Sequence, residues 1–174
     1  YNQQHVAATL GKTLGNTGLM GHASINSSDG YRYNTDFNNQ NYFIKSSFNK
    51  NTNPIDVIAT FSERKFGGNQ FYAIDAKEQY EETQSSLVGV STTWYRGRLK
   101  ITPQLYWKRN QDMYLYIRNK PSVYRNLHIS NKVGGQVNAS FESTLGVTGF
   151  GIDVAKVDMN SNRLGDRNRW VGNF

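Results

Sequence analysis

The side chains that most often carry out catalysis or bind metal ions are few and scattered in this sequence. The three histidines are His5, His22 and His128, and the chain has no cysteine. Zinc sites and hydrolase sites need His, Cys, Asp or Glu clustered at short spacings with definable roles. No histidine here has such neighbours, so we expect no catalytic residue and no resident metal ion or cofactor.

Two weaker patterns lead to the same conclusion. Asp29 and Asp36 flank a polar segment and offer the oxygens that Ca²⁺ prefers. Their spacing matches no established calcium loop, and a solvated loop is the favoured interpretation. Segment 146–151 is glycine-rich like a phosphate loop, but it lacks the Lys-Ser/Thr ending and a following helix. We interpret it as a turn that enters a strand.

Tyrosine and arginine residues in polar segments offer a better basis for binding, because these types are enriched in binding hot spots. Tyr31 and Arg32 lie in one such segment, Tyr72 in a second, and Tyr114 and Arg118 in a third. We predict these five residues as candidate ligand contacts. For each of them, packing of loop on loop or an aromatic collar at a membrane edge is the alternative.

The elements that must position these residues are strands, because the apolar residues recur with a period of two. The clearest case is 133–142, in which one face takes the apolar or small residues and the other takes mostly polar ones. The first set is Val133, Gly135, Val137, Ala139 and Phe141. We predict about eight strands, at 3–10, 17–28, 39–49, 55–66, 81–95, 98–110, 127–142 and 147–159. Several exceed the ~5–6 residues of soluble strands and fit the ~9–11 of a strand that crosses a bilayer.

The predicted connections alternate between short and long. The short ones lie at 12–16, 50–54, 96–97 and 143–146, and the long ones at 29–39, 67–80, 110–126 and 160–168. A barrel in an outer membrane has short turns on one side and long loops on the other. Soluble sandwiches and barrels have no reason to sort loops in this way.

Composition agrees with a sheet that has one wet face and one apolar face. The hydrophobic fraction is 37% and the mean hydropathy is −0.68, yet aromatic residues make up 13%. The net charge of +7 is spread along the chain, so we expect no nucleic-acid partner. No stretch reaches the ~18 apolar residues of a transmembrane helix.

The resulting expectation is an all-β fold, an antiparallel meander of about eight long strands that forms a segment of a transmembrane β-barrel. Residues 1–174 would be a single piece of that barrel. The patterns at 1–8 and 169–174 look like strands cut from something longer. Since every backbone amide in hydrocarbon needs an internal partner, the sheet would cross a membrane only as part of a closed barrel.

Several segments resemble TonB-dependent outer-membrane receptors, closest to cobalamin and siderophore receptors. They are the Ser-Asp-Gly-Tyr-Arg run at 28–32 with Asn-Thr-Asp-Phe at 34–37, the segments 66–72 and 78–83, and the loop-like segment 161–169. The resemblance covers most of the chain and rests on loop motifs.

The resemblance implies a barrel of about 22 strands with an N-terminal plug domain that is absent from this chain. It further implies localisation in the bacterial outer membrane, contact with its lipid, and import of a cobalamin-like or iron-siderophore ligand. TonB would act through the missing plug, and the long loops would contact the ligand.

Two other functions remain open at this stage. A complete eight-stranded outer-membrane barrel with a structural or adhesive role suits the length. A soluble β-sandwich that binds carbohydrate through Tyr and Trp suits the aromatic content.

Overall fold

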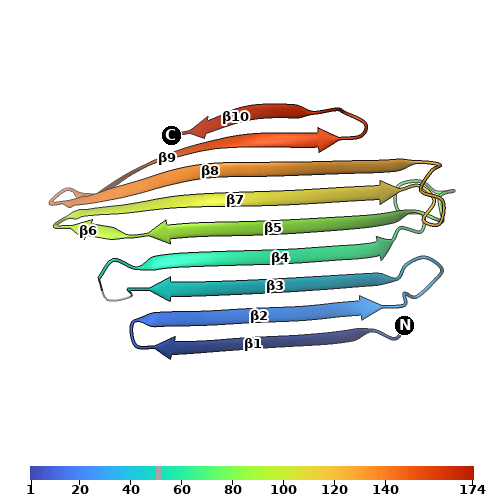
Figure 1. Ribbon diagram of the computed structural model, residues 1–174, viewed down its shortest axis with the longest axis horizontal. Coiled ribbons are helices and arrows are strands. Elements are labelled where there is room, and N and C mark those ends of the chain that lie inside the picture. Colours follow the sequence, from blue (N-terminus) through green and yellow to red (C-terminus); the bar gives the residue numbers. More distant parts are fainter. Residues whose placement is uncertain (50–51) are drawn as a thin grey trace.

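The computed structural model describes residues 1–49 and 52–174, and these form one antiparallel sheet of ten strands (Figure 1). The strands are β1 (Gln4–Leu14), β2 (Thr17–Ser28), β3 (Phe37–Phe48), β4 (Ile55–Gly67), β5 (Tyr80–Thr92), β6 (Trp94–Arg96), β7 (Leu99–Leu115), β8 (Arg125–Ser143), β9 (Gly146–Ser161) and β10 (Arg167–Asn173). Their order in space follows the chain, with β6 paired only to β7. The sheet is not closed, and β1 and β10 lie at opposite edges.

The all-β meander predicted from the sequence is confirmed. The expected strands are β1 to β5 and β7 to β9, and the pattern at the end of the chain is β10. Among the described residues, no helix is long and apolar enough to cross a membrane.

One predicted strand, 81–95, is divided in two. β5 ends at Thr92, and β6 begins at Trp94. The pairings Ser91–Gln104 and Trp94–Ile101 leave Pro103 of β7 between them. Proline has no N–H to donate to a facing strand, so the ladder is interrupted there. The Thr93 N–H instead donates to the carbonyl of Pro54 at 3.2 Å.

The connections are sorted by length as the sequence predicts, with one exception: the connection from Phe48 to Ile55, at the opposite end of the sheet from 162–166, spans six residues against five. The long loops 29–36, 68–79, 116–124 and 162–166 all lie at one end of the sheet, on the right in Figure 1. The short turns lie at the other end. The predicted turn 12–16 is reduced to Gly15 and Asn16, with Gly15 at φ 57°. The predicted turn 50–54 includes residues 50 and 51, which are outside the described residues.

The register gives the sheet two chemically different faces. One cross-strand row consists of Gly21, Ile44, Ala59, Val88, Trp107 and Val133. We call the face that carries this row the apolar face. A row on the other side, the polar face, consists of Ser24, Asn41, Ser62, Ser85, Asn110 and Ser130.

Neither face is covered by a second layer of the described chain. Leu10 is 79% exposed, Leu105 64% and Ile44 61%, although all three lie within long strands. Only four hydrophobic residues of the described chain are buried: Ala76, Leu115, Ala139 and Ala155. The sheet therefore lacks an ordinary core.

Candidate functional site at the long-loop end

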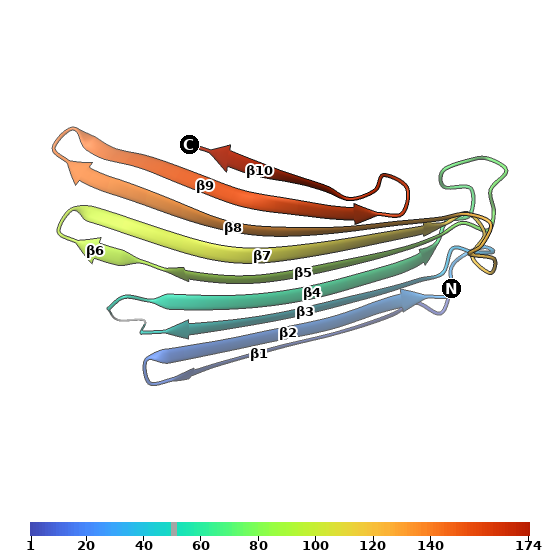
Figure 2. The ribbon, with the colours of Figure 1, turned by 45° about the horizontal axis from the view of Figure 1, so that its top comes forward.

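Three of the long loops fold against one another and form what we call the loop cluster, residues 29–36, 68–79 and 116–124. They lie together beyond the ends of β2 to β8, with the loop 68–79 projecting farthest in Figure 2. Gln79 is 1% exposed, the lowest fraction among the large side chains, and Ala76 is 5% exposed. A polar side chain at the centre of the cluster indicates that hydrogen bonds, more than apolar packing, hold it together.

Asn34 connects the first loop to the second. Its backbone has a φ of 52°, a left-handed conformation that Asn tolerates better than most residues. Its Nδ2 donates to the carbonyls of Lys77 at 2.9 Å and Gln79 at 2.7 Å. Its own carbonyl accepts from the Asn69 N–H at 3.1 Å. The close approach needs a glycine at 67, because a Cβ there would lie 2.5–2.6 Å from Asn34.

Gln79 connects the second loop to β7. Its Nε2 donates to the Tyr114 hydroxyl at 2.7 Å, and its Oε1 accepts from the Tyr72 N–H at 3.2 Å. Its backbone carbonyl also accepts from the Gly68 N–H at 2.7 Å. These bonds satisfy the buried amide of Gln79 and fix Tyr72 and Tyr114 relative to each other.

Arg118 connects the third loop to the first. Its guanidinium donates to both carboxylate oxygens of Asp36, at 2.7 and 2.9 Å, and to Asn34 Oδ1 at 3.2 Å. It also lies 4.6 Å from the centroid of the Tyr80 ring. The hydrogen bonds from Arg118 hold the pKa of Asp36 below its ordinary value. The backbone N–H of Arg118 donates to the Glu78 carbonyl at 2.8 Å, so the side chain and backbone both join the loops.

A chain of aromatic rings runs across this end of the sheet. Successive centroids are 6.2 Å apart for Phe66–Phe71, 4.7 Å for Phe71–Tyr72, 5.3 Å for Tyr72–Tyr114 and 6.2 Å for Tyr114–Tyr124, all in edge-to-face geometry. Such pairs are the preferred arrangement of aromatic rings. We call these five rings the aromatic chain.

Part of the aromatic chain is exposed to solvent. Phe71 is 66% exposed and Tyr72 57%. The Tyr72 hydroxyl donates to Glu81, which raises the pKa of Tyr72 to about 12. At the far end, the Arg163 guanidinium lies 4.4 Å from the Tyr124 ring. Exposed aromatic rings that pack edge to face, with a cation at one end of the row, form a surface suited to binding a ligand with flat or apolar groups.

The five residues predicted from the sequence as ligand contacts lie in different parts of the long-loop end. Tyr72 and Tyr114 are in contact in the aromatic chain. Arg118 lies inside the loop cluster and is engaged with Asp36. The Arg32 guanidinium carbon lies 5.4 Å from the centroid of the Tyr31 ring, and the guanidinium donates to the Asn69 carbonyl at 3.0 Å.

Sequence reasoning missed the residues that organise the cluster, Asn34, Gln79 and Gly67. The paired glycines at 67 and 68 are the one local signal of a close backbone approach. The partners of Asn34 and Gln79 lie on other loops, so their roles depend on the tertiary fold.

The structure offers no support for a metal site in the part of the chain that it describes. No group of three or more His, Cys, Asp or Glu side chains is placed to hold an ion there. Asp36 binds Arg118, and Asp29 accepts a hydrogen bond from Asn2 at 3.1 Å. His22 interacts with Thr9 on the polar face, with 2.7 Å between Nδ1 and Oγ1. Segment 146–151 is the start of β9 after a tight turn, as expected.

No protein-family model, curated protein or solved structure matches this chain.

Proposed function

We propose that the protein is a segment of a transmembrane β-barrel in the bacterial outer membrane, belonging to a TonB-dependent receptor that imports a cobalamin-like or iron-siderophore ligand. The observation that carries the membrane part is the exposed apolar band that crosses the long strands on one face. An exposed apolar surface of this extent marks a site of contact with lipid or another protein. The band, together with loops sorted by length, favours lipid.

The dimensions of the band suit a bilayer. On β8 it runs from Val133 to Phe141, which is about 26 Å along the strand and about 20 Å at a typical barrel tilt. The apolar band of such barrels is ~25 Å tall. Toward the long loops the same face becomes polar, at Gln40, Glu63, Gln84, Asn131 and Asp158. Tyr42, Trp107 and Trp170 lie on this face near that border, and Trp94 lies near the other.

The two alternative functions receive less support. A β-sandwich needs a second sheet, whereas the described residues form one. A complete small barrel needs its first and last strands to pair, whereas β1 and β10 are both edges. Closure with further strands would satisfy both edges, as a bilayer requires.

The ligand part of the proposal is supported by the loop cluster. Its hydrogen bonds hold the aromatic chain at the end of the sheet where a receptor would meet its ligand from outside. The cobalamin-like or iron-chelate class comes from the resemblance of the loop segments. TonB and the plug would supply the energy for transport and would act from outside this chain.

Substitution of the central tyrosines tests the ligand part. Replacing both Tyr72 and Tyr114 by Ala in the full-length receptor removes the middle of the aromatic chain. We expect ligand affinity to fall at least about tenfold, since aromatic hot spots contribute ~2 kcal/mol or more. Tyr95→Ala is the control, because Tyr95 is 63% exposed at the opposite end of the sheet. Unchanged affinity in the double variant would refute the role of the aromatic chain.

An arginine pair tests the membrane part. Val137 lies in the middle of the apolar band, and its neighbour Gln136 lies on the polar face. We expect Val137→Arg to destabilise the barrel folded in vesicles by ~2–4 kcal/mol and Gln136→Arg to have a much smaller effect. Equal effects of the two substitutions would show that the apolar face is not in lipid.

A further inference from the structure

The two ends of the apolar band differ in how their charges are arranged. At the long-loop end the lysines on the apolar face have carboxylate partners. Lys65 Nζ lies 2.9 Å from Glu63 and 4.0 Å from Glu82, and Lys156 Nζ lies 3.2 Å from Asp158. Both lysines at this end are therefore neutralised by carboxylates on the same face, and Arg109, which also lies on this face, donates to Asn131 at 3.3 Å.

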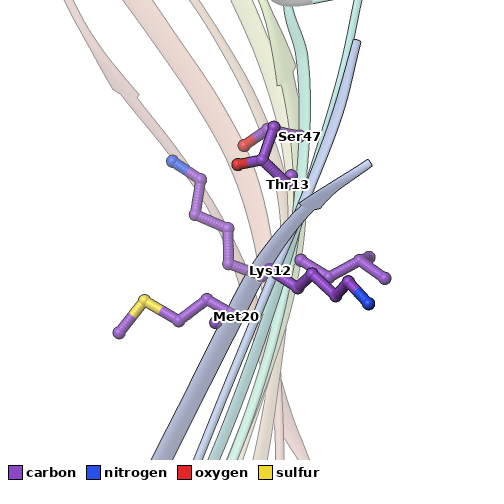
Figure 3. A pocket seen from close by; sticks show the side chains of 8 residues that line it. Lys12, Thr13, Met20 and Ser47 are labelled. Atoms are coloured by element: carbon purple, nitrogen blue, oxygen red, sulfur yellow. The ribbon is translucent and has the colours of Figure 1, made fainter. Parts of the chain in front are cut away.

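At the short-turn end of the same face, the charged residues of the described strands are cations without carboxylate partners. Lys12 pairs across the ladder with Leu19, and Arg96 with Leu99, which places both cations on the apolar face. Figure 3 shows Lys12 on the opposite side of the sheet from Thr13, Met20 and Ser47. No described residue forms an ion pair with Lys12 or Arg96.

The carboxylates nearest to this end lie on the polar face. Asp56 is beside Lys45, at 3.4 Å, and accepts from Ser47. Glu142 follows Phe141 and so points to the side opposite the apolar face. Within the described chain, nothing anionic on the apolar face therefore balances the two cations.

The surroundings of the cations are those of a membrane interface. Trp94 precedes Arg96 by two residues on the same face and is 50% exposed. Phe141 is 49% exposed, and Leu14, beyond Lys12, is 53% exposed. Aromatic rings gather at the level of lipid headgroups, and Lys and Arg extend their charged ends toward the headgroups from apolar surroundings.

We propose that the short-turn end of the apolar face binds the phosphates of anionic phospholipids through Arg96, beside Trp94, and through Lys12. This inference rests on the proposed membrane function and adds a lipid preference at one end of the band. A basic residue near an anionic membrane surface contributes ~1 kcal/mol, which corresponds to about fivefold local enrichment of anionic lipid.

The absence of cysteine from the chain allows a local measurement. A single fluorophore is attached at Ser143→Cys, near Arg96, or at Thr17→Cys, near Lys12, in the full-length protein with any other cysteine replaced. The protein is placed in phosphatidylcholine vesicles that contain dilute spin-labelled phosphatidylglycerol or spin-labelled phosphatidylcholine. The ratio of quenching by the two lipids reports local enrichment.

We expect phosphatidylglycerol to quench about fivefold more effectively than phosphatidylcholine at both positions. Arg96→Gln should bring the ratio at position 143 close to one, and Lys12→Gln should do so at position 17, whereas Arg96→Lys should retain the preference. A fluorophore at Asn168→Cys, which pairs with Asp158 at the long-loop end of the same face, should show no preference, with or without Lys156→Gln.

The outcomes separate this inference from the proposed function. Equal quenching by the two lipids at positions 143 and 17, or a preference unchanged by Arg96→Gln and Lys12→Gln, would overturn the headgroup site and leave the membrane assignment intact. Absence of quenching by either lipid at all three positions would show that the apolar face is not in the bilayer, and both proposals would fail.

Discussion

Arg118 gives the sharpest test of how the loop cluster is held together. Arg118→Gln removes both hydrogen bonds to Asp36 and the contact with the Tyr80 ring. The side chains of Arg118 and Asp36 are 35% and 37% exposed, so solvent screening limits their ion pair to about 0–1 kcal/mol. The ring contact contributes about 0.5–1 kcal/mol. The substitution should therefore favour local opening of the cluster by about 1–2 kcal/mol.

Hydrogen exchange measures this opening directly. The N–H of Asn69 donates to the Asn34 carbonyl, so it exchanges only when the first two loops separate. The N–H of Gly67 donates to the carbonyl of Asp36, the partner of Arg118, so it exchanges when the end of the β3–β4 ladder opens beside the cluster. A change of 1–2 kcal/mol should accelerate their exchange about 5–30-fold. Amides in the middle of β5, such as Val88, should exchange at the rate of the unmodified protein.

Lys120→Gln is the matched control. It removes a cation from the same loop, and Lys120 is exposed without a side-chain partner in the described chain. We expect less than about a twofold change in the exchange of Asn69. If Arg118→Gln leaves Asn69 as protected as before, or accelerates Val88 equally, then Arg118 does not hold the cluster.

Two further predictions concern the same cluster. Gly67→Ala would place a Cβ 2.5–2.6 Å from Asn34, so we expect a loss of about 1–3 kcal/mol of local stability, visible as faster exchange of the loop amides; unchanged exchange would show that the close approach is not required. Hydrogen bonds from Arg118 lower the pKa of Asp36. The stability that the Asp36 carboxylate gives to the loop cluster should therefore be fully present above its ordinary pKa of 3.8 and should be lost as the pH falls through the lowered pKa. Asp36→Asn should abolish that acid transition in loop exchange, and a transition of the same size in this variant would rule Asp36 out as its source.

The strands and the sorting of the loops are predictable because both are encoded locally. Alternation such as that of Val133, Gly135 and Val137 depends only on neighbours in sequence. Every strand except β5, whose second partner is β7, pairs with the next strand in the chain. The interruption between β5 and β6 was missed because the effect of Pro103 depends on which residue stands opposite it. That partner is fixed by the register and not by nearby sequence.

The loop cluster was only partly predictable for the same reason. Residue type alone singled out Tyr72 and Tyr114, and the structure places them in contact. The same reasoning predicted Arg118 as a ligand contact but did not predict its ion pair with Asp36, 82 residues away in the chain. No local sequence pattern distinguishes an arginine whose guanidinium is free to bind a ligand from one that already has a carboxylate partner.

A single-cysteine scan along β8 tests the central claim most directly. Spin labels are placed one at a time from Val133 to Phe141 in the full-length protein in bilayers, and their collisions with oxygen, which concentrates in lipid, and with a water-soluble nickel complex are recorded. The proposed function predicts high oxygen accessibility at Val133, Gly135, Val137, Ala139 and Phe141 and low oxygen accessibility at the positions between them. Equal accessibility to the nickel complex at every position, or a period other than two, would contradict a strand that crosses the membrane.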